Sequence, residues 1–337
     1  MIAAFRKCIL LLILIFSVLS CSNQNRFHGK YADLNEEVKI HRFDLDFISL
    51  DTINTEAGLK SLAEKYPAFY PFFISNILGL NVEDSVGNAE KIAGFLKNST
   101  QRKVFGDIKS ALNELSIQER NLQQAFSALH YYFPEKTFPD MYAMTTGFNL
   151  QFATDDDVIA IGTDFYLGSD YPVYKDVTYD YLIKNFRLEQ FESDVLGQLL
   201  YNWFTVDKTS MTLLDNMLYE GKLMYLKEIA FPDFLEELLM GYTEEENDWF
   251  IKHEKQILSL IFEKKYLYST DYKLINEMIQ PAPFCSPVSQ DAPGRLGVRL
   301  GWEIVRSFMD NNKDVTLPEL MNNRKYQQIF EKSYYRP

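Results

Sequence analysis

The sequence has few basic residues and few histidines, and each shortage narrows the range of functions. Its 337 residues carry 34 Lys and Arg against 47 Asp and Glu, which gives a formal net charge of −13. Nucleic-acid binding needs clustered cations that release counterions from phosphates, and no basic run is present, so we expect no nucleic-acid partner. The four histidines are His28, His41, His130 and His253. They stand too far apart to pair as metal ligands on adjacent turns of one helix.

The signatures of common catalytic sites are also absent. His253-Glu254 supplies the first half of an HExxH zinc motif, but Ile257 stands where the second histidine belongs. There is no Gly-x-Ser-x-Gly elbow, Walker loop or dinucleotide fingerprint. The aspartates at 155–157 lack the spaced oxygens, central Gly and closing Glu of an EF-hand loop, which favours a solvated turn. We therefore expect no metal and no cofactor.

The one long apolar run lies at the N-terminus. Arg6 and Lys7 precede the apolar residues 8–19, which are fewer than the roughly 20 that span a bilayer and are typical of a secretory signal. Val18-Leu-Ser-Cys21 follows and resembles a bacterial lipobox. Residues 1–20 are thus predicted to be a lipoprotein signal peptide, and residues 21–30 a lipidated Cys21 with a polar tether. The lipobox resemblance implies a diacylglyceryl group on the Cys21 thiol and a further acyl chain, such as palmitate, on its amine.

The predicted lipid anchor indicates where the protein resides in the cell, and the cysteine count indicates how its domain is stabilised. Several acyl chains on one residue hold a protein stably in a membrane, whereas a single chain holds it only marginally. No acidic export signal follows Cys21, so we expect a lipoprotein that faces the periplasm, on the outer or the inner membrane of a Gram-negative cell. Because Cys8 leaves with the signal and Cys21 carries lipid, only Cys285 remains and no intramolecular disulfide forms. Residues 31–337 are expected to fold as one globular domain stabilised by packing.

Hydrophobic spacing predicts an α+β domain that is mostly helical, with a small central sheet. Period-two alternation indicates a strand within 37–44, and short apolar segments at 141–147 and 157–162 indicate two more. Thr243-Glu-Glu-Glu246 fits a helix-capping box. Apolar residues three and four apart predict the helices. Their predicted ranges are 55–73 with a break near its two prolines, 89–97, 110–133, 180–204, 212–230, 244–266, 273–280, 293–309 and 317–333.

Two features inside the predicted helices stand out. Three glycines recur at helical spacing, namely Gly294, Gly297 and Gly301. No strand precedes them and no Lys-Ser/Thr follows, which favours close packing against another backbone over phosphate binding. Glu220 lies among residues that look buried, so its carboxylate is either paired with a base such as Lys222 or Arg187, or part of a site. Structural pairing is the favoured interpretation.

Several motifs occur in a fixed order along the chain after the lipobox. They are Arg42-Phe-Asp44, Ile161-Gly-Thr-Asp-Phe-Tyr-Leu-Gly-Ser-Asp170, Tyr219-Glu-Gly-Lys-Leu-Met-Tyr225, Pro293-Gly-Arg-Leu-Gly297, Trp302-Glu-Ile-Val-Arg306 and Ser333-Tyr-Tyr-Arg-Pro337. As an ordered set they resemble the gliding-motility lipoprotein GldB family over nearly the whole chain. The resemblance implies a cell-envelope lipoprotein needed for gliding in motile members and tied to the associated type IX secretion. It implies no known reaction.

A second resemblance concerns the fold. In gluzincin zinc peptidases a strand precedes an HExxH helix, and a later helix supplies a Glu ligand. Here a predicted strand precedes the helix with Gly197-Gln-Leu-Leu-Tyr201, and Glu220 follows on the next helix. The match would place Gly197 and Tyr201 at the histidine positions and Gln198 at the general-base position. Because Gly offers no ligand atom and Gln takes no proton, this resemblance implies a degenerate metallopeptidase fold. The alternative, that any helical protein offers such spacings, stays open.

These observations lead to two hypotheses about function. The first is a non-catalytic lipoprotein that binds envelope proteins or a peptide or cell-wall ligand and is anchored to the membrane through Cys21. The rival is a divergent zincin-like peptidase or hydrolase that uses Glu220. Either would work through a candidate groove with four residues, which are Gln198, Tyr201, Glu220 and Lys222.

Overall fold

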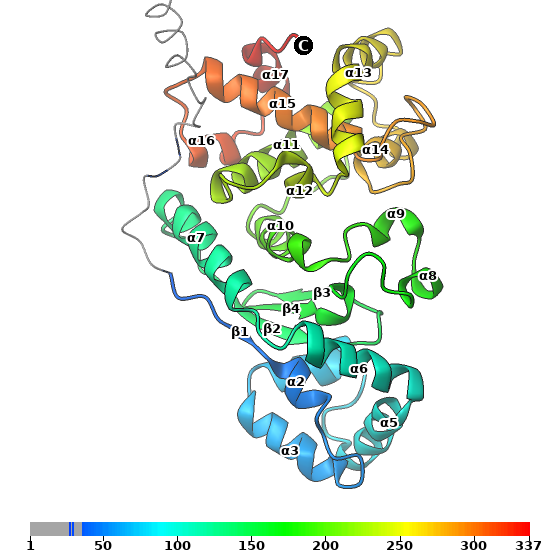
Figure 1. The fold of residues 1–337 in the computed structure, drawn as a ribbon. Helices are drawn as coiled ribbons and strands as arrows, with labels where there is room; N and C mark the ends of the chain where they lie inside the picture. The colour runs from blue at the N-terminus through cyan, green and yellow to red at the C-terminus, as the bar shows by residue number, and fades with distance from the viewer. Residues whose placement is uncertain (1–26, 28, 30–35) are drawn as a thin grey trace, which may run out of the picture.

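The computed structural model describes residues 27, 29 and 36–337 and confirms an α+β fold, with helices on both sides of one small sheet (Figure 1). The predicted signal peptide and Cys21 lie outside the described residues. In the part of the chain that is described, no helix is both long and apolar enough to cross a membrane.

The sheet has four strands, β1 (Ile40–His41), β2 (Asp140–Met144), β3 (Phe152–Asp155) and β4 (Val158–Gly162), in the order β1-β2-β4-β3. β1, β2 and β4 are parallel, and β3 is antiparallel to β4. Alternate residues of β2 and β4 enter two different hydrophobic cores, because successive side chains point to opposite faces of a sheet. β4 is buried along its whole length, which explains its uninterrupted apolar sequence.

One face of the sheet is covered by the N-terminal helices, at the lower end of Figure 1. Aromatic rings fill this core: Phe69 stacks on Tyr142 of β2 with ring centroids 4.2 Å apart, and Phe43 packs edge-on against Phe69 at 4.9 Å. A π-helical turn, Phe73–Ile77, follows Pro71. The helices are α2 (Phe43–Phe47), α3 (Thr55–Lys65), α4 (Phe69–Phe72), α5 (Ser85–Lys97) and α6 (Ser99–Ala111).

The other face packs against α7 (Ser116–Tyr132) and α10 (Phe191–Trp203), beyond which lie the C-terminal helices (Figure 1). Two short helices, α8 (Tyr174–Val177) and α9 (Asp180–Ile183), precede α10. The C-terminal helices are α11 (Leu213–Ala230), α12 (Glu236–Met240), α13 (Glu244–Glu263), α14 (Tyr272–Ile279), α15 (Leu296–Asn311), α16 (Leu317–Asn322) and α17 (Tyr326–Ser333). Three-residue 3-10 helices stand at Thr163–Phe165 and Leu188–Gln190.

At the centre of the C-terminal half, α11 and α15 cross with their backbones in contact. A Cβ atom on Gly301 would lie 1.9 Å from the carbonyl oxygen of Met217, and one on Gly221 would lie 2.3 Å from the carbonyl of Gly301. A Cβ on Gly297 would also come within 2.9 Å of the Met278 carbonyl oxygen. The prediction that these glycines allow close backbone packing is therefore confirmed.

Several predicted boundaries were wrong because apolar spacing continues through turns. The predicted helix 110–133 begins at Ser116, and a separate helix, α6, occupies 99–111. The predicted helices 180–204 and 317–333 are each broken by a loop into two, and the strand within 37–44 contains two residues before α2 begins. β3 was not predicted, since its residues are half-buried and partly polar. The capping box at Thr243 is confirmed at the start of α13.

We predict that Gly301→Ala destabilises the fold, because the three nearest atoms that a new Cβ would meet all belong to the Met217 backbone and cannot rotate away. The free energy of unfolding should fall by about 1–3 kcal/mol or more in urea denaturation. Gly94→Ala in α5 is the matched control, since nothing lies within 4 Å of a Cβ there. It should be neutral or stabilising by about 0.5–1 kcal/mol. Equal stability of the two variants would contradict the close crossing.

Candidate functional site

The polar site of the predicted groove is built where α10 and α11 meet. The Thr212 side chain and Asp215 form a capping box that fixes the start of α11. This start places Glu220 opposite Tyr201 near the end of α10, and the Tyr201 hydroxyl donates a short hydrogen bond to Oε2 of Glu220. Lys208, from the connecting loop, places Nζ 2.9 Å from Oε1 of the same carboxylate. Side chains therefore engage both oxygens of Glu220.

The negative charge of Glu220 is buried, and the positive charge of its partner Lys208 reaches the surface. The Glu220 side chain is only 4% exposed, whereas that of Lys208 is 40% exposed. The Lys208 ammonium also lies over two aromatic rings, 4.6 Å from the centroid of Tyr219 and 5.7 Å from that of Tyr201. Burial, reinforced by the Glu220 carboxylate, raises the pKa of Tyr201, so its hydroxyl stays protonated and acts as a donor.

The expected partner of Glu220 was wrong: Lys208, and not Lys222 or Arg187, forms the ion pair. Lys222 is buried elsewhere, donates to the carbonyl of Asn323 and lies 4.7 Å from the ring centroid of Tyr326. Burial and the nearby Arg324 lower the pKa of Lys222 to about 7. Spacing along the helix favoured Lys222, and no periodic pattern marks a loop residue such as Lys208.

The two remaining positions of the predicted groove have different surroundings. Gln198 donates from Nε2 to Oδ1 of Asn202, 3.3 Å away, on the exposed side of α10. At Gly197, the nearest atom to an added Cβ would be Nζ of Lys227, at 3.9 Å. Lys227 is buried and donates to the carbonyl of Leu239 at the C-terminal end of α12, where a cation is favourable. The structure thus brings Tyr201 and Glu220 together, but not Gln198 or Lys222.

A half-buried acid, Asp194, lies one helical turn before Gly197. Asp194 accepts hydrogen bonds from Gln151 at 3.1 Å and from the Tyr166 hydroxyl at 3.2 Å. Burial raises the pKa of Asp194 and lowers that of Lys227, while attraction between the two groups opposes both shifts. Among residues 27, 29 and 36–337, no three His, Cys, Asp or Glu side chains are placed to hold a metal ion.

Two of the ordered motifs meet at the carboxyl ends of the parallel strands. Asp44, which is fully buried, follows β1 and pairs with Nη2 of Arg42 at 2.8 Å. Thr163, which follows β4, donates to Oδ2 of Asp44 at 3.0 Å and to the carbonyl of Met144. The Arg42-Phe-Asp44 motif is therefore tied to the Ile161–Asp170 motif through side chains 119 residues apart in sequence.

The next residue, Asp164, organises the loop after β2. Its Oδ2 accepts from the amides of Phe148 at 2.8 Å and Thr146 at 3.2 Å, and from the hydroxyl of Thr145 at 3.2 Å. Gly147 and Phe148 have positive φ angles of 68° and 67°, which turn the loop around the carboxylate. Oδ1 of Asp164 is buried with no hydrogen-bond partner, and burial raises the pKa of this group to about 6. The cluster therefore supports the loop and offers no exposed reactive group.

We predict a pH-dependent stability difference between the wild type and Asp164→Asn. The folded protein retains a proton on Asp164 that the unfolded chain loses between about pH 4 and pH 6, so this group's contribution to the free energy of unfolding falls as pH rises through that range. Asn does not titrate, and the variant should gain up to about 3 kcal/mol relative to the wild type from about pH 4 to pH 7. Urea unfolding at several pH values measures this difference, and parallel profiles would contradict the raised pKa.

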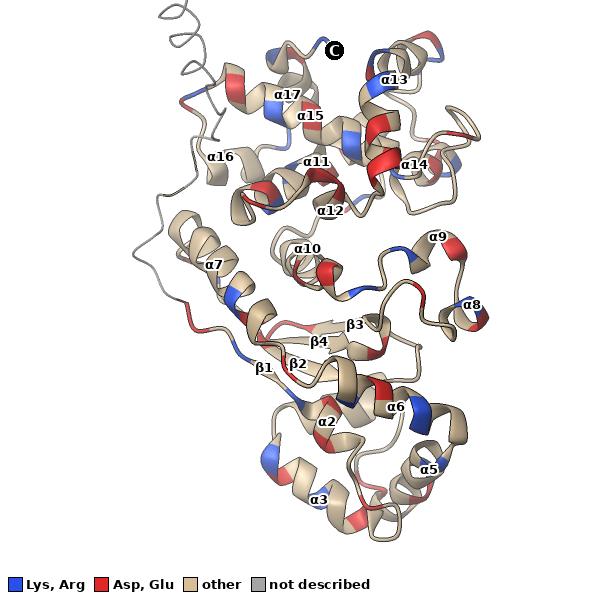
Figure 2. Cartoon of the chain, viewed as in Figure 1, with Lys and Arg blue, Asp and Glu red and all other residues tan. Residues whose placement is uncertain are grey.

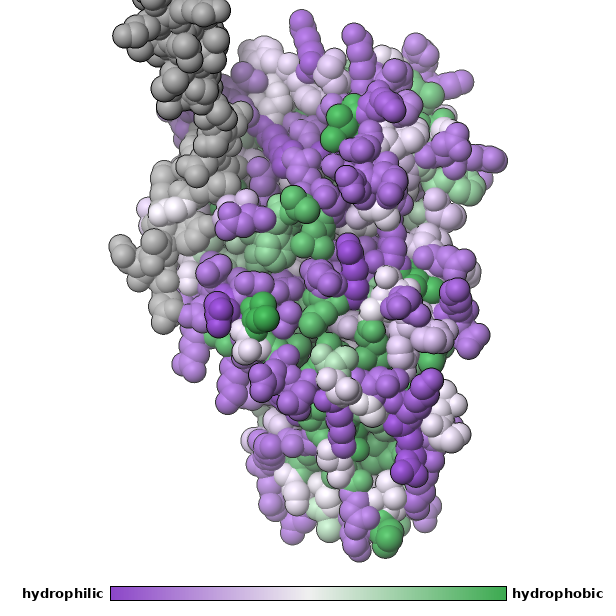
Figure 3. Space-filling view, viewed as in Figure 1, coloured by the Kyte–Doolittle hydropathy of each residue, from purple (hydrophilic) through white to green (hydrophobic). Residues whose placement is uncertain are grey.

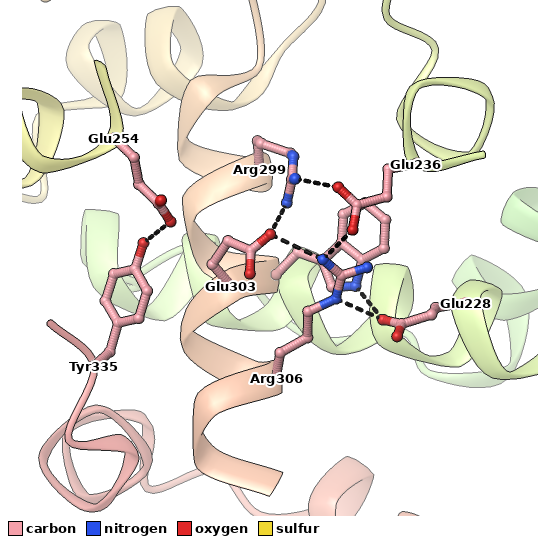
Figure 4. Close-up of polar contacts among 8 residues, drawn as sticks. Glu228, Glu236, Glu254, Arg299, Glu303, Arg306 and Tyr335 are labelled. Carbon is pink, nitrogen blue, oxygen red and sulfur yellow. Dashed lines mark hydrogen bonds and ion pairs between the residues drawn. The ribbon is translucent and has the colours of Figure 1, made fainter. Parts of the chain in front are cut away.

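Charged residues of the Trp302–Arg306 motif form a network with neighbouring side chains around α15 (Figure 4). Arg306 pairs with Glu228 of α11 at 2.8 Å and with Glu236 of α12 at 2.5 Å. Its guanidinium lies 4.0 Å from the ring centroid of Trp302, whose Nε1 donates to Glu228 at 2.8 Å. Arg299 pairs with both Glu236 and Glu303. These bonds hold α11, α12 and α15 together.

The end of the chain is tied to the same region (Figure 4). The Tyr335 hydroxyl, in the last of the ordered motifs, donates a short hydrogen bond to Glu254 of α13. Ser307 of α15 donates to the carbonyl of Ser333 at 2.7 Å. The motifs of the C-terminal half therefore converge on the helices around α15.

The chain folds as a mostly helical α+β domain. Buried polar contacts join the motifs that occur in order along its sequence. The profile of the family described as gliding motility protein GldB matches residues 24–337, so the chain belongs to this family of gliding-motility lipoproteins. No curated protein and no solved structure matches the chain.

Proposed function

We propose that this protein is a periplasm-facing lipoprotein, held in the membrane by acyl chains on Cys21, and that it acts as a non-catalytic binding or assembly component of the gliding and type IX secretion-associated envelope machinery. Its membership of the GldB family over residues 24–337 supports the envelope role. The observation that carries the non-catalytic role is the contact set of Glu220, whose two oxygens are engaged by Tyr201 and Lys208.

The degenerate-peptidase hypothesis would account for the contact between these residues. Under it, Tyr201 and Glu220 would hold the positions of the second histidine and of the glutamate ligand, which a gluzincin brings together on one metal ion. Here the Lys208 ammonium supplies the positive charge beside Glu220, and Gly197 has no ligand atom for the first histidine position. A metal ion would have to displace Lys208 and would find an incomplete ligand set.

A binding role also has surface features that suit it. Tyr201 and Lys208 are 38% and 40% exposed, so a phenol ring and an ammonium are accessible to an envelope protein, a peptide or a cell-wall ligand. Figure 3 shows hydrophobic side chains reaching the surface mainly in the middle of the molecule and toward the end built from α2 to α6. Large contiguous apolar patches often mark sites where partners bind.

We predict that neither the full-length protein nor its Glu220→Gln variant holds stoichiometric zinc when purified in detergent without chelator, as measured by elemental analysis. The variant keeps the shape of the side chain but removes its charge, so it would release any zinc that the Glu220 carboxylate holds. Stoichiometric zinc in the wild type that is lost in Glu220→Gln would overturn the proposal in favour of the zincin-like peptidase or hydrolase.

We further predict that Cys21→Ala moves the protein from the membrane to the soluble fraction, because no acyl chain is then attached. Cys285→Ala is the control, since that thiol is buried and unrelated to the anchor. Cell fractionation and metabolic labelling with palmitate measure the change. A Cys21→Ala protein that still sediments with membranes would refute the lipid anchor.

A further inference from the structure

One residue of the predicted tether is fixed to the folded domain. Phe27 is only 6% exposed, and its ring lies edge-on to Tyr132 of α7 at 5.5 Å and to Tyr225 of α11 at 6.4 Å. The Tyr132 hydroxyl also donates to the Phe27 carbonyl at 2.6 Å. Phe27 is therefore held at a defined point between α7 and α11.

The distance from this point to the anchor is short. Six residue steps separate Cys21 from Phe27, and a fully extended chain spans at most about 22 Å over six residues. A domain held at Phe27 thus cannot turn freely above a membrane that holds Cys21. The surface around Phe27 must remain within this distance of the lipid.

That surface has an unusual composition for an acidic protein. Residues 121–132 of α7 contain no Asp, Glu, Lys or Arg (Figure 2), and the exposed side chains among them are Gln124 and Tyr131. One acidic side chain lies beside them, since Oε1 of Glu36 is 3.6 Å from Nδ1 of His130. Tyr131 is 47% exposed beside Tyr132, with their ring centroids 4.9 Å apart. Tyrosine is favoured at membrane interfaces, since its ring is apolar and its hydroxyl is polar.

Positive charge lies next to the same surface. One turn before Tyr225 on α11, Lys222 donates to the carbonyl of Asn323, which places the linker between α16 and α17 beside this part of the helix. Arg324 and Lys325 of that linker are exposed. Anionic lipid headgroups attract such residues, whereas they repel the rest of a protein with a net charge of −13.

We propose that the tether face, defined as the surface formed by Phe27, the solvent-facing side of residues 121–132 and residues 323–325, rests on the lipid surface that holds the anchor. This proposal depends on the proposed lipidation of Cys21. The short tether favours the bilayer as the partner of this face. Any other partner would have to fit between the face and the membrane, and the chain that joins them spans at most about 22 Å.

The test uses the lipidated full-length protein in vesicles of phosphatidylethanolamine and phosphatidylglycerol that carry a nitroxide quencher on the headgroup. Tyr131→Cys and Tyr272→Cys variants are labelled with a fluorophore; Cys285 is buried, and Cys21 carries lipid. Tyr272 is 78% exposed and starts α14, on the opposite side of the molecule from α7 and α16 (Figure 1). The label at position 131 should be strongly quenched and the label at position 272 should keep its intensity.

A second variant separates docking from anchoring. Phe27→Ala removes the ring that Tyr132 and Tyr225 hold, so the protein should still float with the vesicles while quenching at position 131 falls to the level at position 272. If protein that keeps Phe27 floats without quenching at position 131, or with equal quenching at both positions, the tether face is overturned. Protein that does not float would instead refute the lipidation of Cys21, and with it the proposed function.

Discussion

The backbone contact between α11 and α15 is the constraint on which the C-terminal half of this protein depends. Because Gly221 and Gly301 have no side chains, the two helices approach until carbonyl groups touch Cα atoms, and α11 becomes enclosed nearly all round. A helix so enclosed has no solvent face for its polar residues. Each of them must therefore meet a partner from another element, since an unpaired buried charge is costly.

The buried polar residues of α11 find their partners on different neighbouring elements. Glu220 meets Tyr201 of α10 and Lys208 of the preceding loop, Lys222 meets the Asn323 carbonyl, and Lys227 meets the Leu239 carbonyl. One helix thereby fixes the positions of α10, of α12 and of the linker before α17. The ordered motif Tyr219–Tyr225 is explained by this structural role as well as by any role in binding.

The sequence predicted those features that depend on residue type and on spacing within one helix. The Thr243 capping box, the close packing of the glycines and the need of Glu220 for a base all follow from residue type and spacing, and the structure contains each of them. The identity of that base did not follow, because Lys208 lies in a loop whose path depends on tertiary packing. The same reason explains the missed helix α6 and strand β3, whose apolar stripes are narrow and are completed only by neighbours.

Phe27 and the candidate site are linked by α11, which both contact. Glu220 and Tyr225, which contacts Phe27, are five residues apart on α11 and so lie about 7.5 Å apart along its axis. A domain docked through Phe27 would thus hold the Tyr201–Lys208–Glu220 site close to the bilayer rather than at the far end of the molecule. The partners within reach of such a site would be membrane-associated proteins or cell-wall material next to the membrane.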